Sequence, residues 1–241
     1  MENAEREARI DLAACYRIVA HHGWDDSVFT HISARVPGTD HFLINRFGLL
    51  FEEITASSLV KVDQSGKTID DPTAEINPAG FIIHGAVHTF RPEAACVIHL
   101  HTVAGVAVSA QAEGLLPISQ DALRFDGQVA YHEYQGFVFE ESERERLRLA
   151  LGTCDVMILR NHGTLTVGTT VGEAFLRMYW LERACAFQIA AQGSSQPLIV
   201  PPAPIRDRAR DKAAFITKRA SPFAWAATLR KLDRLDPSYR E

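Results

Sequence analysis

The sequence predicts an α/β fold in which helices cover both faces of a mixed or mostly antiparallel sheet. Segments with helical apolar spacing alternate with short strand-like runs along the 241 residues. Several neighbouring strand patterns are separated only by tight turns, which is typical of hairpins rather than of strand–helix–strand crossovers. The composition, 46% hydrophobic and 23% charged, is that of an ordinary globular protein. We therefore expect a layered domain with one central sheet.

The N-terminal part begins with a helix and continues into three strands. Apolar residues recur at helical spacing over residues 4–22, and Gly23 stands where that helix is expected to end. Residues 29–36 alternate like a strand and stop at a Pro-Gly turn, so residues 41–45 are expected to pair with them as a hairpin. Residues 59–62 form a further strand before a polar turn.

The middle of the chain contains a helix with a clear start. Asn77 is a suitable N-cap and Pro78 suits the first helical position, so this helix is expected to run to about residue 90. A strand over residues 95–100 follows it. Small apolar residues then predict another helix over residues 102–111.

The C-terminal half repeats the same alternation. A charged helix is expected over residues 140–151, and two strands over residues 156–159 and 164–167. Thr170 and Glu173 have the spacing of a capping box, which predicts a long helix from that point to about residue 192.

The remaining residues differ in composition from the rest of the chain. Residues 193–204 are rich in Ser and Pro, as linkers are, and only residues 223–232 show a helical patch. We therefore divide the chain into a domain over residues 1–195 and a Pro-rich arm with a helical tail over residues 196–241.

Composition and charge exclude several classes of function. The net charge of −5 and the lack of a long basic run argue against nucleic acid as a partner. No uninterrupted apolar stretch is long enough to span a membrane. The N-terminus is charged, without the apolar region of a signal peptide, and four scattered cysteines form no CxxC pair. These features favour reduced thiols and a cytoplasmic location.

Three histidines form the strongest functional pattern. His99 and His101 are two apart on an expected strand, so both imidazoles point to the same side of the sheet. His162 lies at the end of another strand, next to Gly163, where a tight turn can present its side chain at the sheet edge. Three convergent imidazoles with an open fourth position are typical of a catalytic site for Zn, Fe, Mn or Ni. The alternative is a set of histidines hydrogen-bonded within a half-buried sheet.

A second histidine pair lies on the helix that begins at Pro78. His84 and His88 are four residues apart and therefore share one face of that helix. Such a pair can bind a second metal. It can equally form a polar stripe over the active site or contact another subunit.

Several sequence runs together resemble one known family. They are residues 30–35 and 45–50, Asn77-Pro78-Ala79-Gly80-Phe81, His99-Leu100-His101-Thr102, Val129-Ala130-Tyr131-His132 and Leu159-Arg160-Asn161-His162-Gly163. The family is that of the class II aldolases and adducins, and the resemblance looks closest to the adducin head domain and its bacterial relatives. It covers residues 10 to 195 in order, so the domain over residues 1–195 is expected to be class II aldolase-like.

The resemblance implies a fold, an assembly and a metal site. The fold is a three-layer α/β/α sandwich around a mostly antiparallel sheet, and the usual assembly is a homotetramer with sites at subunit interfaces. In the sugar-phosphate aldolases of the family, positions matching His99, His101 and His162 hold zinc. The resemblance thus implies one divalent metal per chain, with Zn first and Mn or Fe as alternatives.

One part of the sequence departs from the family pattern. Where those aldolases carry a Ser-Ser-Glu run that binds phosphate and supplies the catalytic base, this chain has Pro78-Ala79-Gly80. Gly48 matches a glycine of the phosphate loop, but Phe47 replaces a small polar residue beside it. A standard sugar-phosphate aldolase is therefore not expected. Arg46, Gly48 and Gly80 remain the candidates for substrate binding.

The expected function is a metal-dependent lyase that breaks a C–C bond in a small carbonyl or carboxylate substrate, by retro-aldol cleavage or by decarboxylation. Decarboxylation needs no base to remove a carbon-bound proton, so it tolerates the missing glutamate. The candidates for proton transfer or substrate contact are His31, His84, Tyr131, His132 and Glu75.

Two other functions remain open. The first is an adducin-like interaction domain whose metal site is vestigial or structural. The chain ends at Glu241 without the long basic tail that adducins use to bind the membrane skeleton, which counts against this alternative. The second is a non-haem iron oxygenase.

Overall fold

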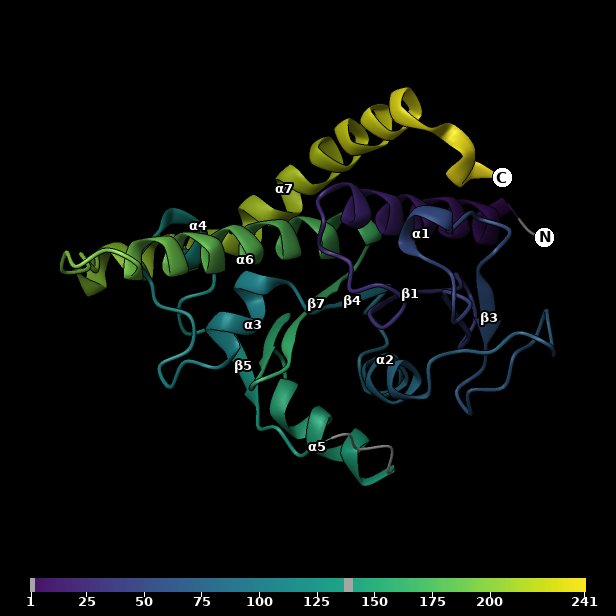
Figure 1. The fold of residues 1–241 in the computed structure, drawn as a ribbon, viewed down its shortest axis with the longest axis horizontal. Coiled ribbons are helices and arrows are strands. Elements are labelled where there is room, and N and C mark those ends of the chain that lie inside the picture. Colours follow the sequence, from purple (N-terminus) through teal and green to yellow (C-terminus); the bar gives the residue numbers. More distant parts are fainter. Residues whose placement is uncertain (1–2, 137–140) are drawn as a thin grey trace.

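A seven-stranded sheet forms the centre of the part of the chain that the structure, a computed structural model, describes, residues 3–136 and 141–241 (Figure 1). The strands lie in the order β3-β2-β1-β4-β7-β6-β5, and among these pairs only β5 and β6 run parallel. Their bounds are β1 His31–Arg35, β2 Phe42–Ile44, β3 Val60–Val62, β4 Cys96–Leu100, β5 Val129–His132, β6 Val156–Leu159 and β7 Gly163–Gly168. The mostly antiparallel sheet expected from the sequence is confirmed.

Helices cover both faces of this sheet, as Figure 1 shows. One face carries α1 (Asn3–His21), α3 (Val103–Ser109) and α6 (Val171–Gln192), and the other carries α2 (Pro78–Phe90) and α5 (Glu141–Leu151). The remaining helical segments are η1 Phe51–Glu53, α4 Gln120–Leu123, α7 Ala203–Leu235 and η2 Pro237–Arg240. The three-layer α/β/α sandwich is therefore confirmed.

Strand β4 separates the two apolar cores and thereby decides on which side the site forms. Ile98 and Leu100 belong to the core beneath α1 and α6, whereas Val97 belongs to the core beneath α2 and α5. Since successive side chains of a strand point to opposite faces, His99 lies on the side of Val97. The pair of His99 and His101 therefore faces the side of the sheet that α2 and α5 cover.

The predicted start signals form two helix caps. The Asn77 side chain accepts a hydrogen bond from the backbone N–H of Ala79 at 3.0 Å, which begins α2. The Thr170 side chain accepts from the N–H of Glu173 at 3.0 Å, which begins α6. The other half of the predicted capping box does not form, because the Glu173 carboxylate accepts from Thr169 instead.

The C-terminal segment differs most from the sequence prediction. The predicted patch over residues 223–232 is only part of α7, which has 33 residues and an internal Pro222. Its buried side chains are few, so the segment shows little apolar periodicity in the sequence. Trp225 and Leu232 nevertheless join the main core beneath α1 and α6.

Strand β5, at the sheet edge, was not among the predicted strands. The helix predicted over residues 140–151 is α5, and its first predicted residue lies outside the described ones. Within residues 3–136 and 141–241, no helix is long and apolar enough to cross a membrane.

Candidate metal centre

A tight turn between β6 and β7 brings His162 to the end of β4. Asn161 has a positive φ of 55°, a left-handed conformation that asparagine tolerates better than most residues. At Gly163 an added Cβ would lie 2.3 Å from the carbonyl oxygen of Leu100, so β7 and β4 can approach this closely only because residue 163 is glycine. The Asn-His-Gly run therefore forms a tight turn that places one imidazole beside the other two.

The three histidines converge as the sequence predicted. One ring nitrogen from each of His99, His101 and His162 lies within 4.8 Å of the others. The Nε2 atoms of His99 and His101 are 2.9 Å apart. His99 is buried, and the other two are half-buried at the edge of a cavity.

The outer ring nitrogens of two of these histidines are held by acceptors. Nδ1 of His99 lies 3.0 Å from the carbonyl oxygen of Thr164, and Nδ1 of His101 lies 3.0 Å from a carboxylate oxygen of Asp26. Because both partners accept, both Nδ1 atoms carry the proton and both Nε2 atoms carry a lone pair in the neutral ring. Two lone pairs that face each other repel unless a cation lies between them. The donor set therefore fits a divalent metal, with oriented imidazoles of the usual kind.

Electrostatics keep the rings of His99 and His162 in the form that binds metals. Burial, together with the neighbouring His162 and His101, holds the pKa of His99 well below its usual value. Burial and the neighbouring His101 lower the pKa of His162 to about 4. Both imidazoles are therefore neutral at physiological pH, with lone pairs available for coordination.

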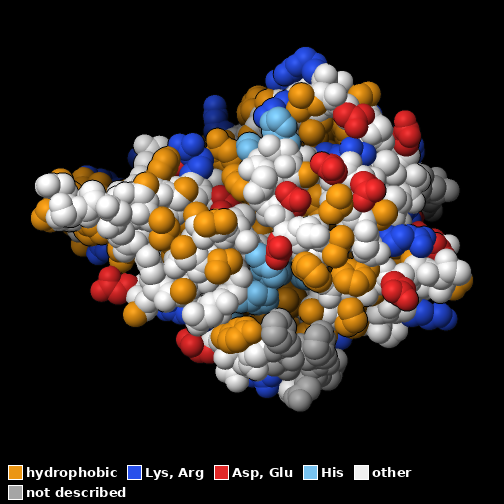
Figure 2. Space-filling model, in the orientation of Figure 1, with side chains coloured by type: hydrophobic (Ala, Val, Ile, Leu, Met, Phe, Trp, Pro, Cys, Tyr) orange, Lys and Arg blue, Asp and Glu red, His pale blue; other side chains and the backbone are white. Residues whose placement is uncertain are grey.

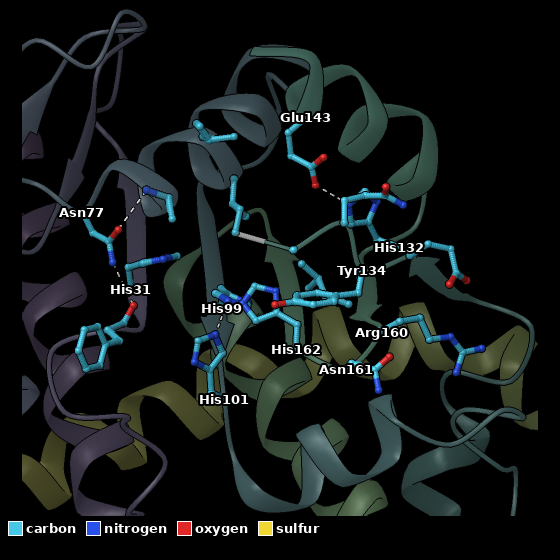
Figure 3. Close-up of a pocket in the computed structure, with 18 of the residues that line it drawn as sticks. His31, Asn77, His99, His101, His132, Tyr134, Glu143, Arg160, Asn161 and His162 are labelled. Atoms are coloured by element: carbon cyan, nitrogen blue, oxygen red, sulfur yellow. Dashed lines mark hydrogen bonds and ion pairs between the residues drawn. The ribbon is translucent and has the colours of Figure 1, made fainter. Parts of the chain in front are cut away.

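The three histidines line a cavity of about 570 Å³, a size that suits a small ligand. His31 and Asn77 lie on one side of it, and Tyr134, His132 and Glu143 lie on another (Figure 3). Figure 2 shows histidine side chains in a hollow near the centre of this face, among acidic and apolar neighbours. Apolar side chains complete the lining: Phe29, Ile82, Ile83 and Leu159.

The five candidates for proton transfer lie in four kinds of place. His31 and His132 line the cavity, and His84 lies directly behind His31, with 2.8 Å between Nε2 of His84 and Nδ1 of His31. Tyr131 packs away from the cavity, where its hydroxyl accepts from the N–H of Leu115. Glu75 is exposed and does not line the cavity.

The candidates for substrate binding are also spread out. Arg46 forms an ion pair with Asp71, and neither Arg46 nor Gly48 lines the cavity. Gly80 lies against the ring of His31, since an added Cβ would be 2.6 Å from Cδ2 of that ring. The structure therefore brings only Gly80 of these three to the metal centre.

The second histidine pair makes hydrogen bonds to one hydroxyl. Nδ1 of His84 and Nε2 of His88 lie 2.5 and 2.7 Å from the hydroxyl oxygen of Ser33. Among the described residues, the only group of three or more potential ligand side chains is that of His99, His101 and His162. The pair thus forms part of a buried polar network behind His31.

Four further groups of the site were missed by reasoning from the sequence. They are the Asp26 carboxylate, the Thr164 carbonyl, Tyr134 and Glu143, of which Glu143 lies 2.6 Å from Nε2 of His132. Glu143 lies in a run of charged residues that is typical of a solvent-exposed helix face, so the sequence gives no sign that it belongs to a site. Asp26 and His101 are far apart in sequence, and no spacing connects them.

Comparisons with known proteins agree with this fold. Residues 10–189 match the family model described as the class II aldolase and adducin N-terminal domain. The chain belongs to the class II aldolase and adducin family. The structure of an aldolase II superfamily protein from Pseudomonas syringae superposes with a TM-score of 0.96 at 48% identity, and the match covers 100% of this chain and 98% of that one.

Two other relatives are an aldolase and an adducin. An L-fuculose 1-phosphate aldolase from Glaciozyma antarctica is 30% identical with a TM-score of 0.84, over 98% of this chain and 93% of that chain. Alpha-adducin of Rattus norvegicus is 44% identical over 198 residues, which are 80% of this chain and 27% of the adducin. This chain is thus similar both to an enzyme and to one domain of a much longer protein.

Proposed function

We propose that this protein is a divalent-metal-dependent lyase that breaks a C–C bond in a small carbonyl or carboxylate substrate. The observation that carries the proposal is the convergence of His99, His101 and His162, two of them with oriented Nε2 lone pairs, at an open cavity. Membership of a family that includes an L-fuculose 1-phosphate aldolase supports the reaction class.

The residues present suit zinc best, with manganese or iron as alternatives, because neutral imidazoles are ligands that all three accept. A bound metal supplies Lewis-acid stabilisation of the negative charge that builds up on an oxygen when the adjacent C–C bond breaks. The protein's part is to orient the substrate and to exchange protons. His31, Tyr134 and the His132–Glu143 pair are the groups at the cavity wall that can do so.

The charges of the cavity favour a substrate without a phosphate group. Arg160 is the only arginine or lysine among the described lining residues, and its guanidinium donates to the carbonyls of Gln111 and Ala112. It also stacks over Tyr131, with 4.3 Å between the guanidinium carbon and the ring centroid, a distance at which a cation and an aromatic face attract each other. Because the Arg160 guanidinium already binds these groups, it provides little attraction for a phosphate dianion. We therefore propose substrates other than the standard sugar phosphates.

Metal analysis of the purified protein tests the proposal. We expect one tightly bound metal per chain, and at least a tenfold loss of metal affinity in His99→Ala and in His162→Ala, because each substitution removes a ligand. His41→Ala is the matched control. His41 lies between β1 and β2, beyond the end of β1 that is opposite His31, and its side chain pairs with Asp40. A protein that binds no metal, or variants that retain it fully, would contradict the proposal.

A panel of small substrates tests the reaction class. Hydroxylated and unhydroxylated 2-oxo acids should release carbonyl products or carbon dioxide only when the protein carries its metal. The readout is product formation followed by NMR. Turnover that survives both chelation and His99→Ala would show that another site is responsible.

The similarity to alpha-adducin supports a second candidate function, an interaction domain that keeps the metal for structure. This alternative predicts that metal removal lowers stability while no substrate of the panel reacts. The lyase predicts turnover.

We also propose that the protein works as a cytoplasmic homotetramer. Large apolar side chains exposed on α6 and α7, among them Phe187, Phe215 and Phe223, support assembly through this side of the molecule. Light scattering of the purified protein gives the mass of the assembly directly.

A further inference from the structure

A chain of hydrogen-bonded side chains runs from the interior of the protein to the metal cavity. It begins at the carbonyl oxygen of Ala94, which lies 3.3 Å from Nδ1 of His88. It continues through Ser33 to His84 and ends at His31, which lines the cavity. Strand β1 and helix α2 supply the four side chains between them.

The backbone carbonyl at the inner end sets the direction of every hydrogen bond in the chain. A carbonyl only accepts, so Nδ1 of His88 carries the proton and its Nε2 accepts from the Ser33 hydroxyl at 2.7 Å. Ser33 has a single proton to donate, so its oxygen must accept from Nδ1 of His84 at 2.5 Å. Nδ1 of His84 therefore carries the only proton of that neutral ring, so Nε2 of His84 is an acceptor, like Nε2 of His88.

The last bond of the chain determines the tautomer of His31. Its Nδ1 lies 2.8 Å from Nε2 of His84, and since that nitrogen accepts, Nδ1 of His31 must donate. A neutral imidazole has only one N–H. Nε2 of His31 is therefore left without a proton.

Burial keeps the whole chain neutral. His84 and Ser33 are 0% exposed, and His31 and His88 are each 3% exposed. A lasting positive charge in such a place is costly unless a carboxylate pairs with it, so in the resting protein the chain consists of neutral donors and acceptors. Burial and the nearby Arg35 lower the pKa of His88 to about 3.

Gly80 leaves room for His31 at the cavity. The edge of the ring that carries Cδ2 and Nε2 faces Gly80, where an added Cβ would lie 2.6 Å from Cδ2 and 3.0 Å from Nε2. Any larger residue at position 80 would displace the ring. Figure 3 shows His31 beside Asn77, at the side of the cavity next to His99.

We propose that Nε2 of His31 accepts the hydroxyl proton of a β-hydroxy carbonyl substrate during retro-aldol cleavage, and that His84, Ser33 and His88 are positioning residues that hold His31 in the required tautomer. The inference rests on the proposed lyase function and narrows its substrate class. A base at this point is needed for aldol cleavage and not for decarboxylation.

The step balances without a further reactant. The hydroxyl proton moves to Nε2 of His31, and the oxygen forms the C=O bond of the first product. The electron pair of the broken C–C bond passes to the second fragment as an enolate. The proton taken up by His31 then passes to the enolate carbon, which gives the second carbonyl product and leaves the His31 ring neutral again.

Nitrogen NMR of the zinc-loaded, ¹⁵N-histidine-labelled protein tests the tautomer. The His31 signals, assigned by their loss in His31→Gln, should show a protonated Nδ1 and an unprotonated Nε2. Ser33→Ala removes the link between His84 and His88, so His31 should shift toward a mixture of tautomers. His84→Gln keeps an acceptor oxygen for His31 and should preserve the wild-type tautomer better than His84→Leu.

Paired substrates test the role in the reaction. With 4-hydroxy-2-oxopentanoate as the β-hydroxy probe, His31→Gln should lower kcat about 100-fold. Metal-dependent decarboxylation of oxaloacetate, which needs no base, should stay within about threefold of the wild-type rate. Metal content should be unchanged in both comparisons.

A pair of glycine variants on α2 tests the packing. Gly80→Ala should displace His31 and lower cleavage of the β-hydroxy probe to a similar degree. Gly85→Ala is the matched control, because its nearest contacts from outside the helix backbone, at 3.2 Å, are with the flexible end of Arg144. It should leave the rate unchanged.

These outcomes separate the inference from the proposed function. A proton on Nε2 of His31 in the wild type, or no response of His31 to Ser33→Ala and His84→Leu, would overturn the positioning role. Equal losses of both reactions in His31→Gln would overturn the role as base. A protein that binds no metal and transforms neither probe would contradict the proposed lyase, and with it the role of His31 in cleavage, while the NMR result would still decide the tautomer.

Discussion

At the scale of single residues, the metal centre depends on which nitrogen of each imidazole is occupied. Thr164 and Asp26 bind the outer nitrogens of His99 and His101, and this leaves both Nε2 atoms directed at the same point. Of these two acceptors only Asp26 is a side chain, so it is the one that substitution can remove. It comes just before Ser27, whose φ of 51° marks a sharp turn.

Removing Asp26 should weaken metal binding without removing a ligand. We expect Asp26→Ala to lower the affinity about tenfold, because His101 loses the partner that orients it and raises its basicity. Competition with a chromophoric chelator measures this. Asp25→Ala removes the same charge from the neighbouring position and serves as the control, and an equal effect of both variants would mean that only net charge matters.

At the scale of elements, the junction of α3, β7 and α6 contains a buried carboxyl group. Glu182 on α6 accepts from the hydroxyl of Thr102, which caps α3, and from that of Thr164 on β7 at 3.3 Å. Burial raises the pKa of Glu182 from 4.5 to about 7, against the opposing effect of these hydrogen bonds. The carboxyl group therefore links α3, the element that follows His99 and His101 in the chain, to α6.

This carboxyl group should make stability fall as the pH rises from about 4.5 to about 7. In that window the unfolded chain has lost the Glu182 proton while the folded protein keeps it, so unfolding releases a proton. Glu182→Gln removes this dependence, and its stability relative to wild type should increase by up to about 3 kcal/mol across the window.

Urea unfolding at pH 5 and pH 8 measures this difference. A Glu182→Gln variant whose stability relative to wild type is the same at both pH values would refute the assignment. Glu145→Gln, on the exposed surface of α5, is a control that changes the same charge without burial.

At the scale of the whole molecule, α7 connects the C-terminus to the domain that carries the site. Trp225 is 9% exposed and packs against Gly172 of α6, where an added Cβ would lie 2.6 Å from it. Its indole N–H donates to a carboxylate oxygen of Asp11 on α1 at 2.9 Å. One side chain thus joins three helices.

Replacing this side chain should destabilise the whole fold. We expect Trp225→Ala to lower the free energy of unfolding by about 3 kcal/mol, because it leaves a cavity and an unpaired partner. Phe223→Ala, two residues earlier and 76% exposed, should change the stability of a monomer by less than about 0.5 kcal/mol. Similar losses in both variants would show that α7 acts through another surface.

Local patterns in the sequence were enough to predict most elements and the candidate metal ligands. Caps at Asn77 and Thr170, strand alternation around His99 and the tight turn at Gly163 depend on near neighbours in the chain, so they can be read without a fold. The extent of α7 could not be predicted in this way, because a mostly exposed helix shows almost no apolar periodicity.

The sequence by itself determined the family and the layered fold, and it singled out the three histidines that the structure brings together, because periodicity and short motifs encode these features. The tertiary structure alone decided which groups complete the site. Asp26 meets His101, and Ser33 joins His84 to His88, only because antiparallel pairing and helix packing bring distant segments together. The chain of hydrogen bonds that ends at His31 has a fixed donor direction, and this direction likewise depends on that packing and on no local sequence pattern.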